Sequence, residues 1–516
     1  MLVGASLRYS QAPSERMQEV LWREGSVKWI GLNLFREKAL VSHICYLVTF
    51  YTLLKTESII SSRDQDKSHL TEPENDIKSI VKGKVGNKLM TLSEVKSLFL
   101  RAPLLKNSSA PSEGGSDKEF CLLANGFWQA EGYIGGIFRS GLNFYPLCTA
   151  TQLFSIESAK FFIRLNKALC NKGTFSITLN SFGKFVIAYR LSGWDTFFSV
   201  FVPYFNMLYG EKYRAILKLN KIYALKNHIK QTSDNMSKVH LISLVYSLTG
   251  YSSNYKVSLE EKLLSLGLDP ALLKELPKVS YKDKPIKPSF LFILGFFLGD
   301  GTLHLKLEWK EKNSTVVICP LFNIVQSNVE SNKYIMEIMT DTLNALNIKT
   351  YLEKSATTYT LTVKGINNVF NSLFPLLKNY SHFLYGKSDS FNLLVWVERL
   401  VNSGGHHTYF GLRALVNKIY ASTNERFTDK EVWMDRIEDW LKVASARRDT
   451  GECYISSIYT SDHKVRGWQV RFPSTLKLPK SNKAFMCSTW DGQDKALAAA
   501  VQYRDKILSD WINQLG

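Results

Sequence analysis

The sequence lacks a long hydrophobic run. The longest candidate, Ala39–Leu54, covers 16 residues and contains His43, whereas a membrane-spanning helix needs about 20 apolar residues. The first forty residues contain glutamates as well as arginines, and transit peptides are poor in acids. We therefore expect no membrane partner, and the N-terminal residues give little sign of a targeting segment.

Cysteine clusters are also absent. The chain has 7 cysteines, an odd number, at wide spacing and with no Cys-x-x-Cys pair. This distribution argues against a disulfide framework and a zinc site, and it fits a reducing compartment rather than secretion.

Acidic residues are few relative to basic ones. The chain of 516 residues has 65 Lys+Arg and 46 Asp+Glu, a formal net charge of +19. Such a surplus attracts polyanions through phosphate neutralisation and counterion release, so it favours a nucleic-acid partner over simple solubility charge. The length predicts two to four domains.

An internal repeat is the most informative feature of the sequence. One helix-length apolar run ends in Glu131-Gly132, and a second ends in Asp300-Gly301. A Phe-x-Ile-x-polar pattern follows each run, 23 residues after the first acid (Phe154 to Ser158) and 22 after the second (Phe322 to Gln326). Each copy then reaches Leu-Tyr-Gly and a lysine, which is Lys212 in the first and Lys387 in the second.

Small residues four apart recur in both runs, as Gly126 with Ala130 and as Gly295 with Gly299. Residues four apart share a helix face, and small residues there allow two helix backbones to approach closely. Each helix should end at its glycine, so the packing predicts both carboxylates at the same end of the pair.

Two carboxylates held close together repel each other unless a cation neutralises them. Mg²⁺ prefers oxygen ligands, and a metal site of this kind can activate water for phosphodiester hydrolysis. A nearby lysine could stabilise the developing charge. The simpler alternative is a helical hairpin whose acids face solvent.

These motifs resemble those of the LAGLIDADG homing endonucleases over residues 118–402. The resemblance implies a mixed α/β (α+β) chain with two pseudo-symmetric αββαββα repeats, whose sheets lie along the DNA major groove. It implies a site-specific double-strand DNA endonuclease that uses Mg²⁺ or another divalent cation such as Mn²⁺, acts as a monomer on double-stranded DNA, and is encoded by an intron of a mitochondrion or plastid.

The same resemblance assigns roles to individual residues. Glu131 and Asp300 are expected to bind metal, assisted by the carbonyls of Ala130 and Gly299. Gln326 is expected to order solvent, with Ser158 in place of a longer polar residue in the first repeat. Lys212 and Lys387 are expected beside the scissile phosphates, with Lys212 shifted by one residue relative to Leu-Tyr-Gly.

The C-terminal unit has three predicted strands, Cys453–Thr460, Gly467–Phe472 and Ala484–Trp490, followed by a helix. Residues 450–512 resemble the ERF-type DNA-binding domain, in which a three-stranded sheet reads the major groove. Strand alternation places Trp468, Val470 and Phe472 on one face and Gln469 and Arg471 on the other, where they are expected to contact DNA. The alternative is a small packing module.

The sequence thus predicts six segments: an N-terminal extension of unclear role (1–117), the first repeat (118–220), a connector (221–287), the second repeat (288–402), a helical linker (403–449) and the ERF-like domain (450–516). Two other functions stay open. One is an intron maturase that binds its host intron RNA to assist splicing, and the other is a DNA-binding regulator without catalysis, which would leave the acid pair unexplained.

Overall fold

The structure is a computed structural model that describes residues 82–101, 116–140, 142–248, 257–277, 281, 287–313, 315–422, 429–446, 452–478 and 482–515. Most of the predicted N-terminal extension, including Ala39–Leu54, lies outside these residues.

The first repeat begins with helix α6 (Asp117–Glu131), which Ser116 and Glu119 cap reciprocally before the apolar run starts. The chain then forms β3 (Gly132–Ser140), β4 (Asn143–Leu153), α7 (Ile156–Ala168), β5 (Thr174–Leu179) and β6 (Phe185–Ser192). Three short turns, α8 (Trp194–Thr196), η1 (Phe197–Phe201) and α9 (Val202–Tyr204), lead into α10 (Gly210–Thr232).

The second repeat follows the same order. Ser289 caps α13 (Phe290–Asp300), and β7 (Gly301–Lys310), η3 (Glu311–Asn313), β8 (Thr315–Ser327), α14 (Glu330–Ala345), β9 (Tyr351–Lys354) and β10 (Thr358–Lys364) come next. The turns η4 (Asn367–Leu373), α15 (Phe374–Asn379) and η5 (Ser381–Phe383) precede α16 (Ser388–Asn402). The predicted αββαββα repeats are therefore confirmed.

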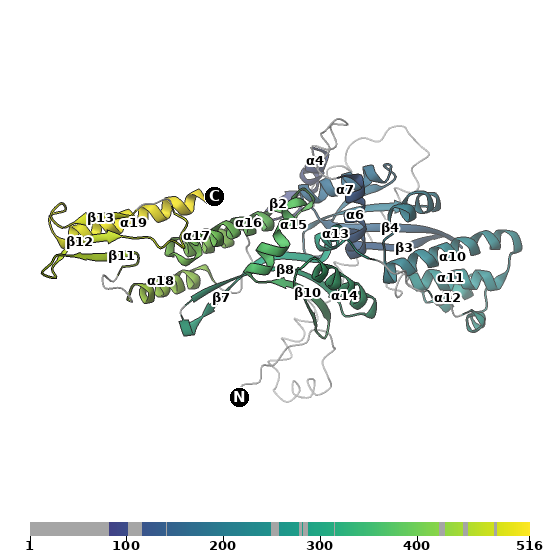
Figure 1. Ribbon diagram of the computed structural model, residues 1–516. Helices are drawn as coiled ribbons and strands as arrows, with labels where there is room; N and C mark the ends of the chain where they lie inside the picture. The colour runs from purple at the N-terminus through teal and green to yellow at the C-terminus, as the bar shows by residue number, and fades with distance from the viewer. Residues whose placement is uncertain are drawn as a thin grey trace, which may run out of the picture. The chain divides into compact units, whose positions relative to one another are not determined.

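Each repeat contains one antiparallel four-stranded sheet, which we call sheet 1 (order β3-β4-β6-β5) and sheet 2 (order β7-β8-β10-β9) (Figure 1). The strand registers of the two sheets match. The glycine directly after each acid pairs with the second strand of its sheet, Gly132 with Ala150 and Gly301 with Ile324. Alternate residues of β4, such as Phe144 and Cys148, are buried on the face that also carries Tyr189 of β6. The opposite faces are more exposed.

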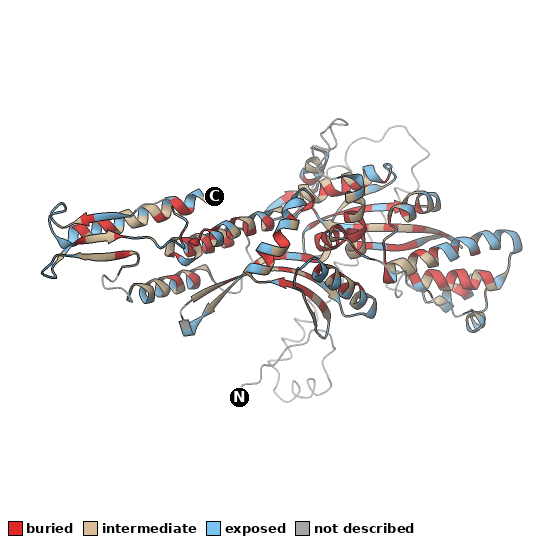
Figure 2. Cartoon of the chain, viewed as in Figure 1, coloured by how far each residue is buried: buried red, intermediate tan, exposed pale blue. Residues whose placement is uncertain are grey.

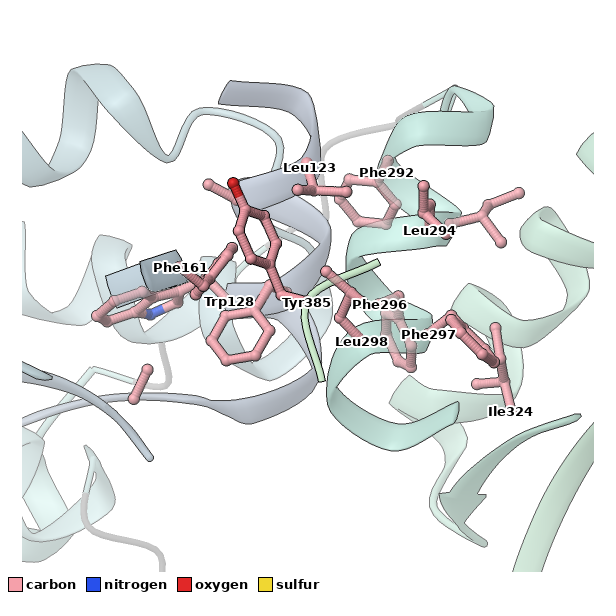
Figure 3. Close-up of a cluster of buried hydrophobic side chains, with 14 of the residues drawn as sticks. Leu123, Trp128, Phe161, Phe292, Leu294, Phe296, Phe297, Leu298, Ile324 and Tyr385 are labelled. Atoms are coloured by element: carbon pink, nitrogen blue, oxygen red, sulfur yellow. The ribbon is translucent and has the colours of Figure 1, made fainter. Parts of the chain in front are cut away.

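Helices α6 and α13 lie side by side between the two sheets (Figure 1). Their side chains are buried along most of their length, and Figure 2 shows this as the red helix pair among the red strands. Close up, Leu123 of α6 lies against Phe292 of α13, while Trp128 and Phe297 point outward into the cores of their own repeats (Figure 3). Phe297 stacks on Phe322 of β8 with ring centroids 4.4 Å apart.

The first repeat carries further elements on either side in the sequence. Before it lie β1 (Lys82–Val85), β2 (Lys88–Thr91) and α4 (Leu92–Arg101), and α4 packs against α7. After it, within the predicted connector, α11 (Asn235–Leu248) packs on α10 and β3, followed by α12 (Leu259–Ser265) and η2 (Pro270–Glu275). None of the described helices is long and apolar enough to cross a membrane.

The predicted linker is helical and packed. After η6 (Gly405–His407), α17 (Tyr409–Ser422) contacts α16 and α18 (Lys430–Ala446). Leu412 and Val416 form a buried cluster with Trp433 and Ile437, against which Trp309 of sheet 2 packs.

The C-terminal unit is a sheet of β11 (Ile455–Tyr459), β12 (Val465–Val470) and β13 (Lys483–Met486), with α19 (Gln493–Gln514) across it. The third strand is shorter than predicted, because the chain turns after Met486. Val470 is buried and Arg471 is exposed, which agrees with the predicted alternation.

Candidate active site

The motif helices touch through their glycines. A Cβ atom added to Gly126 would lie 1.8 Å from the Phe292 carbonyl oxygen, and one added to Gly295 would lie 1.8 Å from the Leu123 carbonyl oxygen. The contacts are reciprocal, since each glycine faces the residue three positions before the other. One turn further on, a Cβ at Gly299 would lie 2.6 Å from the Ala130 Cβ. The close approach predicted from the small-residue spacing is thus present in the structure.

This packing brings Glu131 and Asp300 to the same end of the helix pair. Desolvation, and then repulsion by Asp300, raise the pKa of Glu131 to about 7. Desolvation also raises the pKa of Asp300, although a hydrogen bond from Gln326 opposes that shift. Two partly desolvated acids in mutual repulsion favour the arrival of a cation.

A glutamine amide orients each acid. Gln326 on β8 donates through Nε2 to Asp300 Oδ2. On β4, Gln152 donates through Nε2 to Glu131 Oε1 at 3.1 Å. Because Ala150 and Ile324 hold equivalent positions opposite the glycines, Gln152 and Gln326, each two residues later, are equivalent too.

The expected role of Ser158 was therefore wrong. Ser158 lies in the first turn of α7, where its hydroxyl donates to the Leu153 carbonyl oxygen at 2.9 Å and accepts from the Ser155 backbone N–H. Its place is at a helix cap, and Gln152 occupies the position beside the acid.

Both predicted lysines reach the ends of the motif helices. The Lys212 ammonium donates to the carbonyl oxygens of Trp128, Gln129 and Ala130 at 2.9, 2.5 and 2.8 Å. The Lys387 ammonium donates to the Gly301 carbonyl oxygen at 2.7 Å. Desolvation lowers the pKa of Lys212 to about 7, while the two acids act in the opposite direction. Desolvation lowers the pKa of Lys387 as well.

Two polar residues of α6, which sequence reasoning passed over, fix the segment that leads to Lys212. The buried Asn125 donates to the Tyr204 carbonyl oxygen at 3.0 Å and accepts from the Met207 N–H at 3.0 Å. Gln129 accepts from the Tyr209 N–H at 2.8 Å. Polar residues inside an apolar helix need hydrogen-bond partners when they are buried. The presence of Asn125 and Gln129 in the apolar run was therefore the signal in the sequence that α6 contacts another segment here.

The repeated Leu-Tyr-Gly landmark also has a structural explanation. Tyr209 of the first repeat stacks on Tyr334 of α14 in the second repeat, with centroids 4.6 Å apart. Tyr385 of the second repeat packs on Phe161 of α7 in the first, with centroids 5.4 Å apart, and accepts from Arg164. Each landmark tyrosine thus joins its repeat to the other one, three residues before Lys212 and two residues before Lys387.

The donor set fits a hard divalent cation. Glu131 and Asp300 supply carboxylate oxygens, and the Ala130 and Gly299 carbonyls precede them in the chain, although that of Ala130 accepts from Lys212. Within the described part of the chain, no group of three or more His, Cys, Asp and Glu side chains could form a separate metal site. Any further ligands would be water or substrate oxygens, as is usual for Mg²⁺. A cavity of about 200 Å³ beside Gln152 and Lys387 adjoins the site.

Comparison with known proteins gives matches to solved structures only, since no family model and no curated protein matches the sequence. The chain is similar to LAGLIDADG homing endonucleases. I-SmaMI bound to an uncleaved DNA target in the presence of calcium ions is 19% identical, with a TM-score of 0.48, over 59% of this chain and 99% of that one. I-LtrWI bound to target DNA is 15% identical, with a TM-score of 0.48, over 60% and 100%.

The remaining predicted site residues lie in the C-terminal unit. Gln469 is in the middle of β12, paired with Ser456 and Ala484, and Arg471 follows the end of that strand. The similarity of this unit to the ERF-type domain and its contact with DNA stay predictions.

Proposed function

We propose that the chain is a site-specific double-strand DNA endonuclease of the homing type, which hydrolyses phosphodiester bonds with divalent metal. One observation carries the proposal: two acids, each with its own glutamine and lysine, converge at the end of two glycine-packed helices in a chain of net charge +19.

Each repeat would supply one set of catalytic groups for one DNA strand. Glu131 and Asp300 would hold Mg²⁺ or Mn²⁺, which when bound polarises the phosphate and activates water. Gln152 and Gln326 hold the carboxylates in position, as outer-sphere partners of metal ligands do. Lys212 and Lys387 lie close enough to both acids to affect their pKa values, so the same ammonium groups can stabilise charge on a phosphate bound there.

The faces of the two sheets that lie opposite their buried sides suit DNA. A cross-strand row on sheet 1 consists of Tyr133, Thr149 and Arg190. The equivalent row on sheet 2 begins with Thr302 and Asn323. Hydroxyl, amide and guanidinium groups are those that read base edges in the major groove, and each row begins two residues after the acid of its repeat.

The maturase alternative lacks a specific structural observation in its favour. RNA binding alone would give no reason for two acids to be brought together and oriented by glutamines. The proposal also includes that the protein is encoded by an organellar intron, and this part rests on the resemblance of its motifs to those of LAGLIDADG homing endonucleases.

The decisive experiment is cleavage of DNA that carries the intronless insertion site, in Mg²⁺, by wild type, Glu131→Gln and Asp300→Asn. We expect the wild type to produce double-strand breaks and each variant to lose them while keeping most DNA affinity, since the acids bind metal and not DNA. Undiminished cleavage by both variants would exclude this site.

A further inference from the structure

The hairpin β1–β2, which lies before the first repeat, is docked firmly on sheet 1. The Lys84 N–H donates to the Gly183 carbonyl oxygen at 2.9 Å, and Lys84 bridges in parallel with Lys184 in the β5–β6 turn. A Cβ on Gly83 would lie 2.2 Å from Leu179 Cδ1, so the strand lies directly on the sheet. Phe99 of α4 adds a ring contact with Phe175 of β5, at 5.3 Å between centroids.

Strand pleating determines the direction of the hairpin lysines. Gly83 and its partner Met90 face the buried side, next to Phe185. Neighbouring residues on a strand point to opposite faces, so Lys82 and Lys84 point away from the buried side.

The same alternation places Lys184 on that face. In β6 the side chains of Phe185, Ile187 and Tyr189 are buried on one face, while Val186, Ala188 and the exposed Arg190 lie on the other face. Counting back in twos from Arg190 reaches Lys184, whose bridge partner is Lys84. We call Lys82, Lys84 and Lys184 the lysine ridge.

The ridge is strongly basic, and the acid of the preceding hairpin and helix that acts on Lys82 is Glu94. Residues 82–101 contain five basic side chains and one acid, Glu94. The Glu94 carboxylate accepts from the Thr91 N–H at 2.6 Å and from the Thr91 hydroxyl at 2.9 Å, as part of the cap of α4. All three ridge lysines are exposed, and among the ion pairs of the described residues none includes them.

The turn that carries Lys184 also presents an aromatic ring. Asn180 Oδ1 accepts from the backbone N–H groups of Phe182 and Lys184 at 3.0 and 2.9 Å, which fixes the turn. Phe182 is 84% exposed. An exposed ring next to lysines is a combination that nucleic-acid surfaces use for apolar contact with bases or sugars.

We propose that the lysine ridge is a phosphate-binding extension of the DNA-contacting face of sheet 1, to which Lys82 and Lys84 before the first repeat and Lys184 within it contribute. The proposal rests on the proposed function, since it takes double-stranded DNA as the partner. Gln152 pairs with Ile187, three residues after Lys184, and with strands about 4.8 Å apart and residues about 3.3 Å apart, Lys184 lies roughly 11 Å from Gln152. The ridge therefore grips phosphates a few base pairs from the cleavage position, without reading sequence.

The test compares two triple variants of the full chain. The ridge variant is Lys82→Gln/Lys84→Gln/Lys184→Gln. The control is Lys88→Gln/Lys96→Gln/Lys167→Gln, which removes the same charge from exposed lysines of the same hairpin, α4 and α7. Lys88 pairs with Val85 and so points to the opposite face from Lys84. Thermal unfolding should show both variants folded, because all six side chains are exposed.

Binding of a random-sequence 30-base-pair DNA duplex is measured by fluorescence anisotropy at several KCl concentrations. Loss of three phosphate contacts should lower the slope of log K against log [KCl] by about 2.7 and the affinity at 0.1 M salt by at least about tenfold. The control should change this slope by less than about 0.9, the value expected for one phosphate contact.

Equal slopes for the ridge variant, the control and the wild type would overturn the ridge while leaving the proposed nuclease intact. A loss confined to an RNA duplex of the same length would overturn DNA as the partner. Failure of the wild type to bind duplex DNA at all would overturn both proposals.

Discussion

Gly295→Ala gives the sharpest test of the helix contact on which the site depends. The new methyl group would lie 1.8 Å from the Leu123 carbonyl oxygen, whereas ordinary contact begins at 3.4 Å, so the helices must separate locally by about 1.6 Å. The obstructing atoms belong to the backbone of α6, which cannot turn away as a side chain can.

Two opposing effects set the size of the change. Alanine is a better helix former than glycine by about 1 kcal/mol, and overpacking of a core costs about 1–3 kcal/mol or more. Because the clash here is between backbones, we expect the overpacking cost to exceed that range and the net destabilisation to be about 2 kcal/mol or more. This corresponds to a fall in Tm of roughly 4–8 °C.

The cleavage rate should fall by more than the loss of folded protein alone would explain. Separation of the helices displaces Glu131 relative to Asp300, and a misplacement of about 1 Å can reduce a rate about 100-fold. Thermal unfolding and plasmid cleavage are measured on Gly295→Ala and on Asn220→Ala, an exposed position of α10, where a change within about 0.5 kcal/mol is expected. A Gly295→Ala protein as stable as wild type and fully active would refute the glycine contact.

Three further predictions concern the site and the C-terminal unit. Gln152→Ala should slow cleavage of one strand about 10–100-fold, which would be seen as accumulation of nicked plasmid. Ser158→Ala should change only the free energy of unfolding, by about 1 kcal/mol. Equal cleavage rates for the two variants would contradict the placement of Gln152, and not Ser158, beside Glu131. Since the pKa of Glu131 is raised to about 7, a proton should compete with Mg²⁺ for this carboxylate as the pH falls below 7. Calorimetric titration should show that the Mg²⁺ affinity of the wild type weakens below pH 7, and that the Mg²⁺ affinity of Glu131→Gln does not change with pH in this range. Arg471→Ala should weaken DNA binding by about 1–3 kcal/mol if it contacts a base, or lower the salt dependence by about one unit if it contacts phosphate; unchanged binding would mean that the C-terminal sheet is a packing module.

The sequence was sufficient for the parts of the site that depend on helix periodicity. Glycines four apart followed by an acid and a second glycine fix both the packing face and the helix end, and the structure places Glu131 and Asp300 accordingly.

The glutamine pair could not be found by equal spacing. Gln152 follows Glu131 by 21 residues and Gln326 follows Asp300 by 26, because the hairpin β3–β4 is shorter than β7–β8. The similar offsets of Phe154 and Phe322 were coincidental, since Phe154 comes after the end of β4 and Phe322 lies within β8. The residue of β4 or β8 that lies beside the acid depends on the register of strand pairing. The number of residues in a hairpin does not fix that register unless the turn geometry is known.

The two repeats have diverged where they would meet DNA, and this bears on the target. At equivalent register positions Tyr133 and Thr149 of sheet 1 correspond to Thr302 and Asn323 of sheet 2, and the exposed Arg190 corresponds to the buried Thr362. The helices have diverged as well: Asn125 and Gln129, which hold the Lys212 segment, correspond to Leu294 and Leu298 in α13, so Lys387 is positioned by other contacts. Because side chains of different hydrogen-bonding type prefer different base edges, an endonuclease built in this way would recognise two unlike half-sites, and a palindromic duplex made from either half should bind more weakly than the natural target.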